Sequence, residues 1–251
     1  MTHQPRGRLQ GTAEIVKYNI HQYLGALGFL ALAIAALLFL KLPTIVSLVL
    51  LLAISVVGYW SIASIIVSFI VYDASRIYDP VWMRTLVDDS PAKWANVHAG
   101  VDDFSGPLSH AYGQPLYNWD IFDERTMSEP SILRARSIRS SALGATVDFR
   151  KLPCNAGELD AVFAFFVLHE IRDDSLRRDC FDEIARCTSP SGKLVIVEHL
   201  RDLPNFVAFG PGLLHFWPRS EWLRSASLAG FELLNEAPMT PFVRVMVFKK
   251  L

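Results

Sequence analysis

Two adjacent pairs of polar residues, His169-Glu170 and Glu198-His199, stand where apolar runs of strand composition end. The unperturbed pKa of histidine lies near working pH, which suits His169 to act as a general base toward a hydroxyl, thiol or amine. Glu198 and His199 form a second candidate pair for the same chemistry. We therefore predict His169, Glu170, Glu198 and His199 as catalytic residues.

Both pairs belong to one segment, residues 159–202, whose pattern is strand, helix, strand. Residues 162–168 form a near-continuous apolar run, typical of a strand covered on both faces. Apolar residues then recur at helical spacing until residues 190–192 (Pro-Ser-Gly) stop the helix, and residues 193–197 resume strand composition. Two buried strands joined by a helix form a right-handed parallel βαβ unit, and such sheets bind ligands at the carboxyl ends of their strands.

The stretches VDFRKLPCNAGELDAVFAFFVLHEIRDD (residues 147–174) and FDEIARCTSPSGKLVIVEHLRD (residues 181–202) resemble the central part of class I S-adenosylmethionine-dependent methyltransferases. In that family an acid, a Leu-Pro, an Asp before the fourth strand and a Pro-x-Gly before the fifth recur. The resemblance spans residues 94–251. It implies an α/β, Rossmann-like fold with a seven-stranded, mostly parallel sheet, helices on both faces and an antiparallel last strand.

The resemblance also implies S-adenosylmethionine as cofactor. In the first strand and turn, residues 94–100, Asn96 stands at the place of the family's acid and Gly100 at a glycine position, whereas His98 replaces a glycine. Asp120 lies twenty positions beyond Gly100 and matches the acid that binds the ribose hydroxyls. Asp148 matches the acid that binds the adenine amino group, and Phe149 is placed beside the ring. The predicted cofactor-binding residues are Asn96, His98, Gly100, Asp120, Asp148 and Phe149.

Some of these acids also suit simpler roles. Asp123 competes with Asp120 for the ribose, and either is also an ordinary turn residue. Asp103 or Ser105 is suited to cap the following helix. The acids at 102–103 would repel a pyrophosphate, which disfavours NAD, whereas a cofactor that carries a sulfonium and an ammonium tolerates them.

An aromatic, glycine-containing insertion at residues 205–222 (NFVAFGPGLLHFWPRSEW) follows the last of the polar pairs. Aromatic side chains with a few polar groups suit an apolar substrate pocket or lid. We predict His215, Phe216 and Trp217 as substrate-binding residues. The alternative is a helix that covers the sheet or dips into a membrane.

The hydrophobic content of 51% and the mean hydropathy of +0.28 are high for a soluble protein. The excess lies in residues 24–40 and 44–72, which contain no charged residue. A bilayer core of about 30 Å needs about 20 apolar residues in a helix. We predict a tail and helix start at residues 1–22, a two-helix transmembrane hairpin at 23–72, a juxtamembrane connector at 73–93 and a methyltransferase-like domain at 94–251.

Basic residues flank both spans, so the positive-inside rule places both termini and the catalytic domain in the cytoplasm. The connector is either a helix at the headgroup level or an ordinary linker packed on the domain. The arginines of residues 131–139 are expected on a solvated face. Three cysteines lack metal spacing and are expected as reduced packing residues, so we expect no metal site. A net charge of -1 makes nucleic acid an improbable partner.

These features predict a membrane-anchored methyltransferase whose partners are the lipid bilayer and a lipophilic or amphiphilic acceptor: a lipid, quinone, isoprenoid or small thiol. The same features are compatible with a non-catalytic, membrane-tethered binding or scaffolding module, and with a soluble enzyme whose apolar arm serves oligomerisation. The acceptor atom and the oligomeric state, including a homo-oligomer, stay open, because a fold does not specify a substrate.

Overall fold

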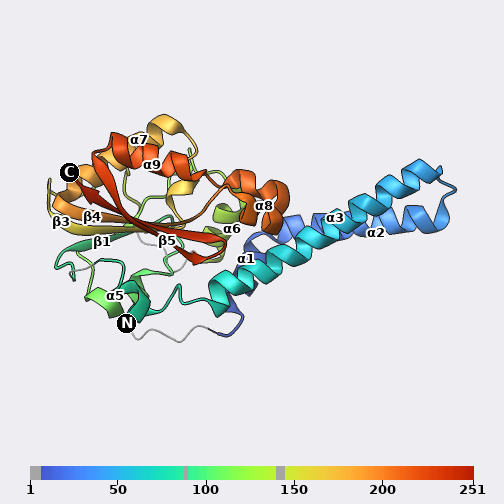
Figure 1. The fold of residues 1–251 in the computed structure, drawn as a ribbon, viewed down its shortest axis with the longest axis horizontal. Helices are drawn as coiled ribbons and strands as arrows, with labels where there is room; N and C mark the ends of the chain where they lie inside the picture. The colour runs from blue at the N-terminus through green and yellow to red at the C-terminus, as the bar shows by residue number, and fades with distance from the viewer. Residues whose placement is uncertain (1–6, 88–89, 140–144) are drawn as a thin grey trace.

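Two long helices project side by side from an α/β domain in the computed structural model of this chain, which describes residues 7–87, 90–139 and 145–251 (Figure 1). The two parts of the sequence with different composition therefore form different parts of the structure. The domain holds the sheet, and the projecting pair holds the uncharged runs.

The sheet of the domain contains six strands in the described ranges, in the spatial order β2-β1-β3-β4-β6-β5. Their bounds are β1 (Trp94–His98), β2 (Tyr117–Asp120), β3 (Leu159–Phe165), β4 (Thr188–His199), β5 (Phe231–Thr240) and β6 (Val243–Lys250). β2, β1, β3 and β4 are parallel, whereas β6 is antiparallel to both β4 and β5. This confirms a Rossmann-like, mostly parallel sheet with an antiparallel last strand.

The prediction of seven strands is wrong for the part of the chain that the structure describes. The strand expected at residues 147–149 is reduced to one isolated parallel bridge between Asp120 and Thr146. The Val147 N–H donates to the Asp120 carbonyl oxygen at 2.8 Å, and a hydrogen-bonded turn at residues 148–151 follows at once. Because the chain turns so soon, no second ladder pair forms there beside β2.

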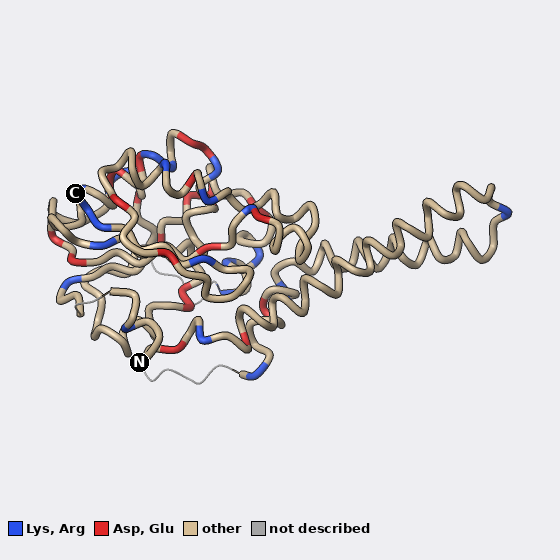
Figure 2. The backbone as a smooth tube through the Cα atoms, in the orientation of Figure 1, with Lys and Arg blue, Asp and Glu red and all other residues tan. Residues whose placement is uncertain are grey.

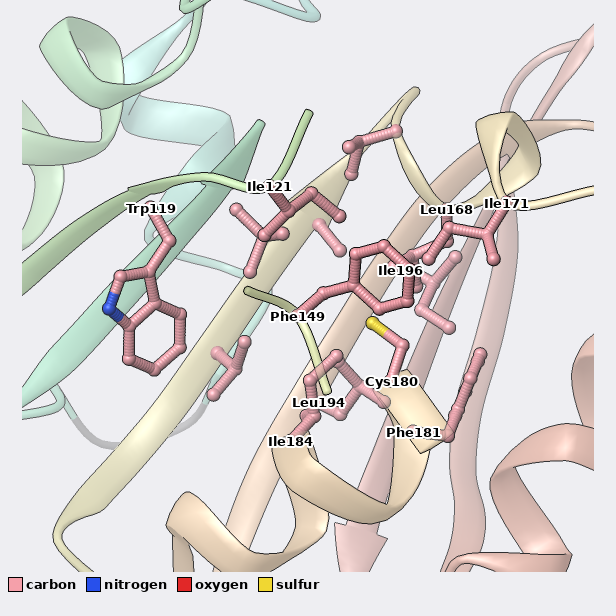
Figure 3. Close-up of a cluster of buried hydrophobic side chains, with 14 of the residues drawn as sticks. Trp119, Ile121, Phe149, Leu168, Ile171, Cys180, Phe181, Ile184, Leu194 and Ile196 are labelled. Carbon is pink, nitrogen blue, oxygen red and sulfur yellow. The ribbon is translucent and has the colours of Figure 1, made fainter. Parts of the chain in front are cut away.

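Helices cover both faces of the sheet, as predicted (Figure 1). On one face lie α7 (Asp174–Cys187) and α9 (Arg219–Leu228), and on the other lie α5 (Ser105–Tyr112) and the short α4 (Pro80–Met83). α7 begins where the Asp173 carboxylate accepts from the N–H groups of residues 175 and 176, and its apolar positions recur at helical spacing. Phe181 and Ile184 pack against Leu194 and Ile196 of β4 (Figure 3).

The projecting helices are α2 (Ile20–Phe39) and α3 (Thr44–Phe69), and α3 continues as a π-helical segment, η1 (Ile70–Ala74). Lys41 at the tip is the one charged residue of the sequence between 24 and 72 (Figure 2). Both helices are long and apolar enough to cross a membrane, and almost none of their apolar surface is buried within the chain. By length and composition they are candidate membrane spans.

The base of this hairpin is fixed to the domain through α1 (Gln10–Tyr18). Asp73, at the end of η1, accepts from the N–H groups of Gly11 and Thr12 at 2.8 Å each. On the other side of α1, Arg139, which caps α6 (Pro130–Ile138), binds the Glu14 carboxylate at 2.7 Å. α1 is thereby held between the hairpin and the domain.

The predicted solvated face of arginines is therefore wrong. Arg134 donates to the Tyr18 carbonyl oxygen at 2.8 Å, Arg136 binds Asp120 at 2.8 Å, and Arg139 binds Asp103 at 2.8 Å in addition to its contact with α1. The chain places α1 over these side chains, so that they bind internal acceptors rather than water. This arrangement depends on long-range contacts that local charge patterning does not reveal.

The connector packs on the domain, which decides between the two predicted alternatives. Ile77 and Met83 are fully buried against the face of the sheet that α5 covers. The cysteine prediction holds for Cys180, which is buried and free, and is wrong for Cys154 and Cys187, which form a disulfide with a Cα–Cα distance of 6.0 Å.

A second contact joins the hairpin to the domain through α8 (Leu203–Phe209) and the 3₁₀ segment η4 (Gly210–His215). The Trp60 ring of α3 lies edge-on to Phe206, with 5.9 Å between ring centroids. Gly210 has a φ of +54°, and a Cβ built there would overlap the Trp60 ring. Glycine is required on both counts, because other residues are strained at this φ and have no space.

We predict that Gly210→Ala destabilises the full chain in detergent by about 1–3 kcal/mol through strain and overpacking against Trp60. Thermal unfolding followed by circular dichroism measures the loss. Gly212→Ala is the matched control, because the nearest atom to its added Cβ lies at an ordinary 3.6 Å. Equal stability of the two variants would contradict the contact between α3 and η4.

Candidate active site

A cavity of about 470 Å³ lies between the base of the hairpin and the carboxyl ends of β3 and β4. Its domain side includes five predicted site residues: His169, Glu170, His199, His215 and Phe216. Its hairpin side includes Tyr23 of α2 and Trp60, Ser61, Ser64 and Ser68 of α3. Three of the four predicted catalytic residues and the candidate membrane spans thus line a common cavity.

His169 lies on the 3₁₀ turn η3 (Leu168–Glu170) that follows β3. Its Nδ1 is 2.8 Å from an oxygen of Glu198, and its Nε2 is 3.4 Å from Glu170 Oε1. Burial alone would lower the pKa of His169, but the two carboxylates outweigh it and raise the pKa to about 10. In this arrangement His169 keeps its proton at neutral pH and cannot accept another.

Glu198 lies at the end of β4 and is fully buried. One of its oxygens binds the His169 ring, and the other accepts from the Val167 N–H at 3.1 Å. Because both oxygens are engaged and no surface is exposed, Glu198 is placed to orient His169 rather than to touch a ligand. The adjacent β3 and β4 ends bring the two predicted pairs together, as the parallel sheet requires.

His215 reaches the same cluster from η4. Its Nε2 is 3.9 Å from Glu170 Oε1, its Nδ1 is 3.7 Å from Glu129, and its ring lies edge-on to His169 with centroids 4.8 Å apart. The Arg172 guanidinium donates to the His215 carbonyl oxygen and fixes η4 beside η3. Burial, with the charge of His169 in second place, lowers the pKa of His215 to about 4. This imidazole is neutral at physiological pH.

His199 is held by a different set of partners. Its Nδ1 is 2.9 Å from the Phe242 carbonyl oxygen, which makes Nδ1 the donor, so Nε2 accepts from the Tyr72 hydroxyl at 3.0 Å. Phe216 stacks on the ring with 4.8 Å between centroids. Burial lowers the pKa of His199 to about 4, so it too is neutral. Its nitrogens are occupied, and the Tyr72 hydroxyl is the polar group that this pair presents to the cavity.

The turn after β1 is closed by its own polar side chains. Asn96 is buried and donates to Asn118 at 2.8 Å and to Asp102 at 3.2 Å. Asp102 also accepts from the Ser105 N–H at 2.9 Å, at the start of α5. Burial would raise the pKa of Asp102, but His98 and its hydrogen-bond donors lower it. The prediction that Asp103 or Ser105 caps α5 is wrong: the residue before the helix is Phe104, without a side-chain cap, and Asp102 binds the first turn instead.

Arg136 of α6 lies over Gly100, directly beside this turn. Gly100 has a φ of +88°, and a Cβ built there would overlap the Arg136 guanidinium. The same guanidinium donates to both Asp120 oxygens, at 3.0 and 2.8 Å, and lies 4.0 Å from the centroid of the Phe122 ring. Asp120 is 2% exposed, so Arg136 is the partner that neutralises a buried carboxylate.

A second cavity, of about 530 Å³, lies beside Arg136. Asp148, Phe122 and Arg136 line it, whereas the neighbouring α6 residue Ala135 lines the first cavity. α6 thus contributes residues to both cavities. Asp148 is half exposed and binds Arg150 at 2.8 Å, and this bond lowers the pKa of Asp148.

Two predicted site residues have little surface toward the cavities. Phe149 lies at the second cavity but is 1% exposed and packs in the core (Figure 3), so it has almost no surface for stacking on a ligand. Trp217 packs under the guanidinium groups of Arg172 and Arg177, at 4.8 and 4.2 Å, and does not line the first cavity. Phe122 lines the second cavity, and Phe216 is among the aromatic residues that line the first.

Sequence reasoning missed Arg136, Tyr72 and Glu129. The spacing of Arg136 on a short helix gave no sign that it would lie over Gly100. Tyr72 carried the pattern of a membrane-belt residue, and only the return of η1 to the sheet places its hydroxyl on His199. Glu129 precedes a proline at the start of α6, which resembles an ordinary helix start.

Residues 120–196 match the model of a family described as a methyltransferase domain. The chain is similar in structure to a SAM-dependent methyltransferase from Aquifex aeolicus, with a TM-score of 0.52 and 16% identity over 70% of this chain and 93% of that one. It is also similar to the [4+2]-cyclase SpnF, with a TM-score of 0.50 and 18% identity over 71% and 81%. No curated protein matches. At these identities the likeness to solved structures shows the fold.

Removal of Arg136 leaves the buried Asp120 carboxylate without its cation, bonded to the Phe122 N–H. We predict that Arg136→Met lowers the unfolding free energy of the ligand-free chain by about 3–5 kcal/mol. The double variant Asp120→Asn/Arg136→Met should recover part of this loss, because it removes the stranded charge. Chemical denaturation measures both.

The matched control is Arg125→Met, which removes an exposed arginine from the same region. Surface changes of this kind stay within about 0.5 kcal/mol. If Arg136→Met unfolds at the same denaturant concentration as Arg125→Met, the ion pair with Asp120 does not form in solution.

Proposed function

We propose that the chain methylates a lipophilic or amphiphilic acceptor that enters from a membrane. The premise is the class I S-adenosylmethionine-dependent methyltransferase fold of the domain, together with the match of residues 120–196 to a methyltransferase family. The observation that carries the proposal is the shared cavity: its floor is the predicted catalytic cluster, and its wall is the base of the candidate membrane hairpin. The family match and the fold support S-adenosylmethionine as cofactor.

Residues in contact with Arg136 and residues of the second cavity fit this cofactor in type. Gly100 has a left-handed conformation and no side chain, so a cofactor can approach the backbone closely there. Asp120 lies at the carboxyl end of β2, where such sheets bind ligands. The space over Gly100 is filled by Arg136, so this guanidinium has to leave Asp120 before ribose hydroxyls can bind there. Asp148, half exposed at the second cavity, is available for the adenine amino group.

Apolar surface next to the cavity supports an acceptor from the bilayer. Leu203, Phe206 and Val207 of α8 and Leu214 of η4 are exposed, and α8 packs against α3. These side chains extend the apolar surface of the hairpin onto the domain, as in elements that lie at a membrane interface. A lipophilic molecule can thus reach the cavity without crossing water.

The cofactor supplies a methyl group on a positively charged sulfur, which an acceptor displaces in line. The chain contributes position: it holds the acceptor among Tyr72, Phe216 and the hairpin serines and excludes water from the cavity. The cluster of His169, Glu170 and His215 lies at the floor, and the neutral His215 imidazole is the histidine of this cluster that could take the proton of an acceptor's hydroxyl or thiol. Glu198 acts as a positioning residue through its bond to His169.

A non-catalytic, membrane-tethered module is the second candidate. The observation in its favour is the Arg136–Asp120 pair, which satisfies the predicted ribose acid without any ligand. The two candidates differ in one measurable property, the binding of S-adenosylmethionine by the full chain.

We predict that Arg136→Met binds S-adenosylmethionine several-fold more tightly than the wild type, because Arg136 no longer competes for Asp120. Asp120→Asn/Arg136→Met should bind at least tenfold more weakly than Arg136→Met, a loss of about 1.4 kcal/mol or more from the ribose contact. Titration calorimetry in detergent measures all three. Both variants lack the arginine, so their difference reports the carboxylate. Absence of binding in all three folded proteins would favour the tethered module instead.

A second prediction concerns entry of the acceptor. Ser61→Trp fills the cavity from α3 and should lower methyl transfer on the order of 10–100-fold by displacing the acceptor, with cofactor affinity unchanged. The assay follows labelled methyl into the organic-extractable fraction of vesicles made from membrane lipids. Ser55→Trp, exposed on the same helix, is the control. Label that enters only water-soluble acceptors would contradict a lipophilic substrate.

A further inference from the structure

His169, Glu170 and His215 bring three metal-ligating side chains to the floor of the first cavity. The atoms that face one another are His169 Nε2, Glu170 Oε1 and His215 Nε2, all within 4.8 Å of one another. The nearer two separations are 3.4 Å, from Glu170 to His169, and 3.9 Å, from Glu170 to His215. We propose that these residues bind a divalent transition-metal ion such as Zn²⁺, with an open coordination position toward the cavity.

The distances between the three ligand atoms are close to those between the ligands of a bound metal ion. Zinc lies about 2.0–2.2 Å from imidazole nitrogen and carboxylate oxygen, so neighbouring ligands in a tetrahedral site are about 3.4 Å apart. The His169–Glu170 distance already has this value. His215 has to approach by about half an ångström toward Glu170 and by up to about 1.4 Å toward His169, and its side chain is 26% exposed, so it is less constrained than the other two.

The outer nitrogens of both imidazoles face carboxylates. His169 Nδ1 is bonded to Glu198 at 2.8 Å, and His215 Nδ1 is 3.7 Å from Glu129. Metal-bound histidines almost always donate the other ring N–H to a carboxylate, a carbonyl or water, which orients the ring and makes it a better ligand. Glu198, fully buried and otherwise bound to a backbone N–H, has the position and partners of such an outer group.

The cluster also has an unsatisfied polar atom. Glu170 Oε2 is buried and has no hydrogen-bond partner among the residues that the structure describes. Buried carboxylate oxygens normally have a partner, because their desolvation is costly. A cation between the three side chains that both oxygens of Glu170 bind would give Oε2 a partner.

The formal charges fit a divalent ion. Glu129, Glu170 and Glu198 surround two imidazoles, and Arg172, which lies over η3 and η4, offsets one of the three negative charges. Metal binding requires His169 to give up the Nε2 proton that it holds in the ion-free chain, and two negative charges remain once both imidazoles are neutral. A mixed set of imidazole and carboxylate ligands favours zinc and its neighbours over Mg²⁺ or Ca²⁺. Three protein ligands with one free position are typical of a site at which a further molecule binds.

Sequence spacing does not reveal this site. His169 and Glu170 are adjacent, but His215 comes from the aromatic insertion, and Arg172 holds that insertion in place through the His215 carbonyl oxygen. The inference does not depend on methyl transfer, because ion binding is measurable with neither cofactor nor acceptor.

The test uses the full chain in detergent, purified through a tag without histidine and treated with a chelator. Zn²⁺ is added in competition with a chromophoric chelator, and Co²⁺ is added separately to record its ligand-field spectrum. We expect one tightly bound Zn²⁺ per chain and a Co²⁺ spectrum of low coordination number. His215→Ala and Glu170→Gln should each weaken binding by more than the 10–100-fold typical of losing an outer-shell partner, and His169→Ala should abolish it.

His110→Ala, an exposed histidine on α5, is the matched control and should bind as the wild type does. Circular dichroism establishes that each variant is folded, and Glu170→Gln keeps the size and shape of the side chain in case His169→Ala does not fold. Absence of tight Zn²⁺ binding in the wild type overturns the proposal. So does an ion that persists in His215→Ala and Glu170→Gln, which would be an adventitious ion only.

Discussion

Glu198 places a carboxylate in the interior of the domain, and the surrounding structure has to compensate for it. An unpaired buried charge is worth several kcal/mol of instability, so the residues that meet it are restricted in type. The Val167 N–H and the His169 ring supply the partners, and both come from the turn that follows β3. The ends of β3 and β4 are thus locked together by a polar contact at the edge where this class of sheet binds ligands. Every other group of the cluster is arranged around the imidazole that Glu198 orients.

The second organising feature is the base of the hairpin, which closes the site on the side opposite the sheet. α1 is held by Asp73 on one side and by Arg139 on the other, and Trp60 packs on Gly210. None of these contacts involves the exposed apolar length of α2 and α3. The apolar part of the two helices projects away from the domain, whereas the polar residues near their base form one wall of the cavity. This explains why serines and a tyrosine lie in an otherwise apolar segment.

The sequence predicted the parts that depend on local pattern: the βαβ unit, the helix within it and the apolar hairpin. The expected helix stop at residues 190–192 was wrong, because α7 ends at Cys187 and these residues already belong to β4. Prediction also failed where long-range contacts decide. The third strand ended after one bridge because the chain turns at Asp148. The arginines of α6 looked solvated, because nothing in the sequence places α1 and Asp120 beside them. Of the three residues predicted in the insertion, His215 and Phe216 line the cavity, whereas the Trp217 ring packs under the guanidinium groups of Arg172 and Arg177.

Arg136 connects these observations. It occupies the space over Gly100, neutralises Asp120 and lines the cavity beside Asp148. A cofactor that binds Asp120 has to replace this guanidinium, and the buried carboxylate then needs a new set of donors. The ion pair therefore stabilises the ligand-free domain and at the same time lowers its affinity for anything that binds Asp120. The glycine-poor first turn has the same consequence: its side chains bind one another, and Asn96 and Asp102 keep the turn closed without a ligand. Stability of the empty site and affinity for a ligand are thus set by the same few polar contacts.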